Sequence, residues 1–104
     1  PTKASLAKLL HLAANDPSSL VRLYVASALQ RTPVPARYPI LEALVSREED
    51  IQDHNLPLMY WYAMEPVVGQ DAQQGLSLLK ACRIPLLRQF ITRRMATESL
   101  VAQR

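Results

Sequence analysis

The chain has 104 residues, 49% of them hydrophobic, and a formal net charge of +3 at pH 7. That length suffices for one domain with a modest continuous core and is too short for two. Only two glycines are present and helix formers dominate, which disfavours a sheet of hairpins with Gly or Asn-Gly turns. We therefore expect an all-α fold with residues 1–104 as a single domain. Because the sequence opens on Pro1 and stops at Arg104 inside an amphipathic stretch, we expect a piece of a larger multidomain protein.

The first half of the chain predicts two helices and a break. Apolar residues at helical spacing predict a helix near 3–14. Asp16 and Pro17 are the start signal of a second helix near 17–31, with Asp as the cap and Pro in the first turn. The two prolines of residues 32–35 must break that helix, because proline lacks the amide donor and restrains the residue before it.

The middle of the chain predicts two further helices. A helix near 36–46 carries four apolar residues on one face. Asn55 can cap the next helix, near 56–68. Pro66 should kink or end that helix.

The last two helices have the clearest signals. Asp71 and Gln74 have the spacing of a capping box for a fifth helix near 72–82. A sixth helix near 84–102 shows a pronounced two-faced pattern. Its inner face is predicted to hold Leu87, Phe90, Ile91 and Met95.

Three six-residue segments are similar to one another, namely residues 19–24 (SLVRLY), 57–62 (PLMYWY) and 85–90 (PLLRQF). Since they begin at 19, 57 and 85, the offsets are 38 and 28 residues, near the periods of helical-pair solenoids. They predict a HEAT-like α-solenoid of three antiparallel helix pairs in a right-handed superhelical stack. Equivalent side chains should form a ladder of core contacts between neighbouring pairs. The ladder is expected to hold Leu20, Leu58 and Leu86 in one layer and Tyr24, Tyr62 and Phe90 in another.

Few residues suggest chemistry. Cys82 has no second cysteine for a disulfide, haem attachment or a zinc site, and we expect it to be a small buried hydrophobe. His11 and His54, the latter beside Asp53, could belong to a metal site, but helix-flank and turn-capping roles explain them better. No stretch reaches the roughly 18 apolar residues of a membrane span. We expect no catalytic residue, cofactor, metal ion or direct membrane insertion in this segment.

Three successive aromatic residues, Tyr60, Trp61 and Tyr62, form a candidate site. Successive side chains on a helix point about 100° apart, so at least one of them should approach the surface. An exposed Tyr60 or Trp61 would indicate a docking surface, because aromatic side chains are favoured at interfaces. The alternative is core packing between repeats.

Charge is distributed in three blocks. The net charges are +4 over residues 1–47, −6 over residues 48–79 and +5 over residues 80–104. One interpretation is pairing between the acidic middle and its two basic neighbours. The other is a basic patch for an acidic partner, made of Lys80, Arg83, Arg88, Arg93 and Arg94. Together with the aromatic residues, these give a candidate interaction surface of Tyr60, Trp61, Arg88, Arg93 and Arg94.

Residues 16–31, 37–40, 55–66 and 84–91 resemble the HEAT-like region of large exported membrane-bound dehydrogenases of the planctomycete and verrucomicrobial type. Those proteins carry a β-propeller before the helical region and a c-type cytochrome domain after it. The most specific part of the resemblance is the NLPLM run at 55–59 followed by Glu65-Pro66. The resemblance implies a periplasmic or otherwise exported parent with c-type haem elsewhere, since the haem motif has no counterpart in these 104 residues.

We therefore expect a non-catalytic scaffold and protein-interaction segment of a multidomain dehydrogenase. Its partners would be flanking domains or another protein, and a stack cut from a longer array should self-associate through its exposed end repeats. A free-standing HEAT-type protein-binding module is an alternative. A HEAT-like DNA glycosylase is another, with Glu65 or Asp53 as its carboxylate, but the acidic middle block argues against nucleic acid.

Overall fold

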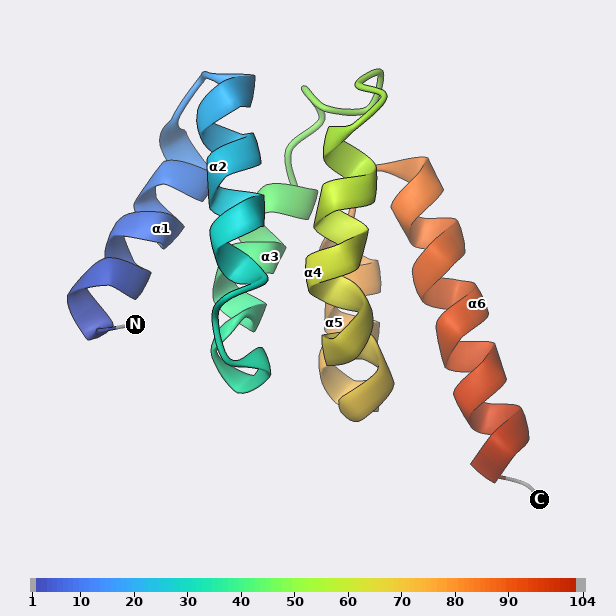
Figure 1. The fold of residues 1–104 in the computed structure, drawn as a ribbon. Helices are drawn as coiled ribbons and strands as arrows, with labels where there is room; N and C mark the ends of the chain where they lie inside the picture. Colours follow the sequence, from blue (N-terminus) through green and yellow to red (C-terminus); the bar gives the residue numbers. More distant parts are fainter. Residues whose placement is uncertain (1, 103–104) are drawn as a thin grey trace.

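The computed structural model describes residues 2–102, which form six α-helices and no strand (Figure 1). The all-α prediction is confirmed, and each predicted helix end lies within two residues of the observed one. The elements are α1 (Lys3–Asn15), α2 (Ser19–Leu29), the 3-10 helix η1 (Val34–Ala36), α3 (Tyr38–Val45), α4 (Leu56–Gln70), α5 (Ala72–Ala81) and α6 (Pro85–Ala102).

The helices lie in two rows. In one row α2 packs on α4 and α4 packs on α6, and in the other α1 packs on α3 and α3 packs on α5. Figure 1 shows the first row in front, with α3 and α5 behind it. The shortest dimension of the molecule is 19 Å, which matches two layers of helices about 10 Å thick.

A single hydrophobic core fills the space between the rows. The large side chains buried there come from α2 to α6, because each of these helices turns its most apolar stripe inward. They include Val25, Leu29, Ile40, Leu41, Leu44, Met64, Leu78, Leu87 and Ile91. The inner face predicted for the sixth helix is confirmed, with Leu87 and Ile91 buried and Phe90 and Met95 packed against the core.

Five of the six predicted ladder residues lie on the surface, so their assignment to the core is wrong. Leu20 and Tyr24 on α2 are 73% and 61% exposed, and Tyr62 on α4 is 58% exposed. On α2 the inward stripe is formed by residues such as Val25 and Leu29. Leu20 and Tyr24 lie on the opposite side of the helix, given 100° per residue. The remaining ladder residues are Leu58 and Leu86, which are also exposed, and Phe90, which is partly buried.

Two helix caps differ from the prediction. Ser18, not Asp16, caps α2, and its Oγ accepts a hydrogen bond from the Val21 amide at 3.3 Å. Asp16 is instead the residue that follows the C-terminus of α1. Its carboxylate accepts a hydrogen bond from the Ser18 amide at 2.9 Å. At α4 the side chain of Asn55 makes no capping bond. Asp53 serves there and accepts from the amides of residues 55 and 56, at 2.8 Å each, which lowers the pKa of Asp53.

The other two predicted signals have different outcomes. Asp71 caps α5 as predicted and accepts from the Gln74 amide at 3.1 Å. Pro66, in contrast, does not end α4, which continues to Gln70. The carbonyl of Tyr62 is the one that loses its helical donor to Pro66. Tyr62 lies on the exposed side of α4, where water can supply the missing donor.

Candidate interaction surface

The corners between α1 and α2 and between α5 and α6 have the same geometry. Asp16 ends the first helix with φ −73° and ψ 129°, and Cys82 ends the other with φ −73° and ψ 126°. Six residues later, Arg22 and Arg88 each donate a hydrogen bond from Nη1 to the carbonyl of that corner residue, both at 3.1 Å. The two corners, which lie 66 residues apart in the chain, therefore share the same backbone angles and the same arginine contact.

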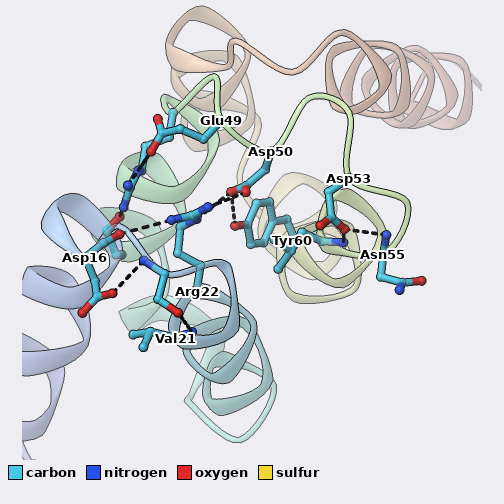
Figure 2. A network of polar contacts seen from close by, with 12 residues as sticks. Asp16, Val21, Arg22, Glu49, Asp50, Asp53, Asn55 and Tyr60 are labelled. Carbon is cyan, nitrogen blue, oxygen red and sulfur yellow. Dashed lines mark hydrogen bonds and ion pairs between the residues drawn. The ribbon is translucent and has the colours of Figure 1, made fainter.

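A longer connection, residues 46–55, joins α3 to α4 and supplies a buried carboxylate (Figure 2). Asp50 accepts two hydrogen bonds from Arg22, from Nε at 2.8 Å and from Nη2 at 2.7 Å, and a third from the Tyr60 hydroxyl at 2.7 Å. These three side chains are at most 3% exposed. Burial and the hydrogen bond to Asp50 raise the pKa of Tyr60 far above its ordinary value. Tyr60 is thus a structural residue and not part of an exposed surface, contrary to the expectation from the sequence.

Three of the five predicted surface residues meet in one groove between α4 and α6. The groove encloses about 270 Å³ and is lined by Trp61, Phe90, Arg93, Arg94 and Thr97. The rings of Trp61 and Phe90 lie with their centroids 5.4 Å apart at 47° to one another, a tilted aromatic contact that stabilises the α4–α6 packing. Trp61 is consequently half-buried and presents only part of its ring to the groove.

The arginines predicted as a patch are mostly engaged by the chain itself. Arg94 donates from Nε to Glu65 at 3.0 Å and also pairs with Glu98, and these carboxylates raise the pKa of Arg94. Arg88 is exposed but bonds the carbonyls at the end of α5. Arg93 is exposed, and no ion pair involves it in the part of the chain that the structure describes.

The charge blocks pair with one another, as the first interpretation predicts. Each of four ion pairs joins the acidic segment 48–79 to a basic neighbour. They are Arg22–Asp50, Arg47–Glu49, Arg83–Glu48 and Arg94–Glu65. The fifth pair, Arg94–Glu98, lies within the last block. A continuous free patch of five cations is therefore not present, because Arg83 and Arg94 already have acidic partners.

Five of the six predicted ladder residues are exposed large apolar side chains. They lie on the three helices of the front row, and we call this set the outer face. The outer face consists of Leu20 and Tyr24 on α2, Leu58 and Tyr62 on α4, and Leu86 on α6. Large exposed apolar side chains on neighbouring helices are candidates for an interaction site.

The remaining sequence candidates have local partners. His11 on α1 lies within 3.3 Å of the Asn15 amide nitrogen, and Asp53 and Glu65 are occupied by the cap and the ion pair described above. Among the residues that the structure describes, no three His, Cys, Asp or Glu side chains are grouped to hold a metal ion.

A search for membrane-spanning helices and comparisons with known proteins give no further information on this surface. No helix in residues 2–102 combines the length and the apolar character needed to cross a membrane. Comparisons with protein-family models, with curated proteins and with solved structures found no match for the chain.

Cys82 is buried, as predicted, and we expect it to react slowly. Its side chain is 4% exposed, and burial raises the pKa of the thiol. Because the thiolate is the reactive form, native protein at pH 8 should react with Ellman's reagent at least about tenfold more slowly than the same protein in urea. Equal rates in the two states would contradict this expectation.

Proposed function

We propose that this chain is a HEAT-like α-solenoid of three antiparallel helix pairs, α1/α2, α3/α4 and α5/α6, in a right-handed superhelical stack. The matching corners at Asp16 and Cys82 support this, as do the contacts within the two rows. In Figure 1 the chain descends through α2, α4 and α6 and ascends through α1, α3 and α5. In such a stack each pair leans on the next, so the chain works as an elongated support.

The proposed role is a non-catalytic scaffold that binds other protein domains through the outer face. The observation that carries it is the exposure of large apolar side chains at equivalent positions of α2, α4 and α6. Surfaces of this kind gain binding energy from buried Tyr and Leu side chains. From the family resemblance we further propose that the partners are the flanking domains of an exported, periplasmic dehydrogenase that carries c-type haem outside this segment.

The test uses the full-length protein that contains this segment. We expect its visible spectrum and a haem assay to show covalent c-type haem. A double variant, Leu20→Ser and Tyr62→Ser, should leave the melting temperature within about 3 °C, because exposed substitutions change stability little. It should weaken protection of the outer face in hydrogen exchange of the full-length protein. A haem-free protein would remove the dehydrogenase context and leave a free-standing binding module. Unchanged protection would overturn the role of the outer face.

A further inference from the structure

A second groove lies between α1 and α2, and among residues 2–102 only these two helices and the segment after α2 line it. Its volume is about 390 Å³. Apolar side chains form its floor, and Lys8 and Arg31, both exposed, stand at its rim. The floor consists of Leu9 and Leu12 from α1 and Ala28 from α2, with Tyr24 beside it. The groove is thus apolar inside and basic at its edge.

The repeat geometry indicates what such a groove accepts. At the offset of 66 residues, Tyr24 is equivalent to Phe90 and Ala28 to Arg94. On α6 these two positions meet a neighbouring helix, since Phe90 packs on Trp61 of α4 and Arg94 pairs with a glutamate of α4. On α2 the same positions face the open groove. A helix lying in the groove would contact α2 as α4 contacts α6. It would present a large apolar side chain, as α4 presents Trp61, and a carboxylate, as α4 presents Glu65.

Charge selects among the helices that could lie there. No ion pair involves Lys8 or Arg31 in residues 2–102. A second copy stacked end to end on this groove would bring either the same two cations or the α6 end, where Arg88 and Arg93 are exposed. Both pairings place like charges together, which disfavours the self-association predicted from the sequence. An acidic helix is the complementary partner.

We propose that the groove between α1 and α2 binds an acidic amphipathic helix of a partner protein. Its apolar stripe packs on Leu9, Leu12 and Tyr24, and carboxylates flanking that stripe pair with Lys8 and Arg31. This is the helix-in-groove mode of recognition. The site is separate from the outer face, with which it shares only Tyr24, so the two can be tested by different variants.

The probe is a labelled amphipathic helical peptide of about 18 residues, with a Leu and Trp stripe flanked by Glu, and its binding is measured by fluorescence anisotropy. A matched peptide carries Lys in place of every Glu. We expect the acidic peptide to bind at least about tenfold more tightly than the basic one, and more weakly as salt is added. The double variant Lys8→Glu, Arg31→Glu should reduce affinity for the acidic peptide by about tenfold or more.

A second double variant, Lys3→Glu and Arg93→Glu, is the matched control. It makes the same charge change at exposed positions outside the groove, and we expect less than about a twofold change in affinity. Circular dichroism melting checks that both variants stay folded. Equal binding of the two peptides, or equal loss in the two variants, would overturn the proposal. So would sedimentation evidence of a dimer of the chain that the Lys8→Glu, Arg31→Glu variant abolishes.

Discussion

Replacing Asp50 with alanine is expected to lower the free energy of unfolding by about 3–5 kcal/mol, because it leaves the guanidinium of Arg22 buried without a counter-charge. Arg22 is 3% exposed and directs two hydrogen bonds at this carboxylate. The Tyr60 hydroxyl would lose its acceptor as well. Among the described residues every buried side-chain nitrogen or oxygen has a hydrogen-bond partner, so the substitution would create unpartnered donors in a fully satisfied interior. Urea unfolding followed by circular dichroism measures the change.

Two comparisons separate the buried ion pair from general effects of removing an acid. Glu49→Gln removes the neighbouring carboxylate, whose side chain is 55% exposed and pairs with Arg47, and should leave the urea midpoint almost unchanged, because exposed ion pairs contribute little to stability. The triple variant Arg22→Met, Asp50→Leu, Tyr60→Phe should recover most of the loss, since apolar side chains can replace a buried ion pair. If Asp50→Ala does not fold, Tyr60→Phe still gives a graded loss of about 1 kcal/mol. An Asp50→Ala cost similar to that of Glu49→Gln would contradict the prediction.

The helices could be predicted because their signals are local. Apolar spacing and caps such as Asp71 act within one or two turns. The arrangement of charge blocks could also be anticipated, because blocks of opposite sign in one small domain cannot lie far apart. These features depend on composition and on near neighbours in sequence, and the structure agrees with them.

Two sequence signals bear on whether the ladder is buried, namely the similarity of the three segments and the apolar stripe of each helix. Similarity among the three segments indicates which residues are equivalent, but it does not tell which side of the helix is buried. That information was present in α2, where Val25 and Leu29 define an apolar stripe on the side away from Leu20 and Tyr24. The repeat similarity alone therefore predicts a buried ladder, whereas the stripe on α2 predicts an exposed one.

The buried polar residues had no local signal. Asp50 stands in an acidic run that reads as a solvated turn, and its burial depends on Arg22, which is 28 residues earlier in the chain. The same limit applies to the candidate interaction surface. Tyr60 is buried and its hydroxyl donates to Asp50, a contact that the sequence pattern does not indicate. Such pairs follow from tertiary packing, and no pattern within a single helix could identify them.

Arg37 offers a second test of this buried polar framework, and Arg37→Ala is expected to cost about 2–4 kcal/mol. The Arg37 side chain is 8% exposed and has no acidic partner among the described residues. Its guanidinium donates to three backbone carbonyls, those of Thr32 at 2.9 Å, Ala63 at 2.9 Å and Gln30 at 3.4 Å. These bonds tie the end of α2 to α4. Burial lowers the pKa of Arg37, but a guanidinium stays charged at neutral pH. Removing it takes a donor from each of these carbonyls, and two of the three lost bonds are buried.

The controls for Arg37 separate the effect of the planar guanidinium, which donates to three carbonyls at once, from the effect of its charge. Arg37→Lys keeps the charge but cannot reach three carbonyls from one rigid group, so it should recover less than half of the loss. Arg31→Ala, at an exposed position six residues earlier, should change stability by no more than about 0.5 kcal/mol. In hydrogen exchange, Arg37→Ala should increase the exchange of amides in residues 30–37 and at the middle of α4, because the two segments are held together through this side chain. Exchange that increases uniformly over all six helices would contradict the proposed local tie.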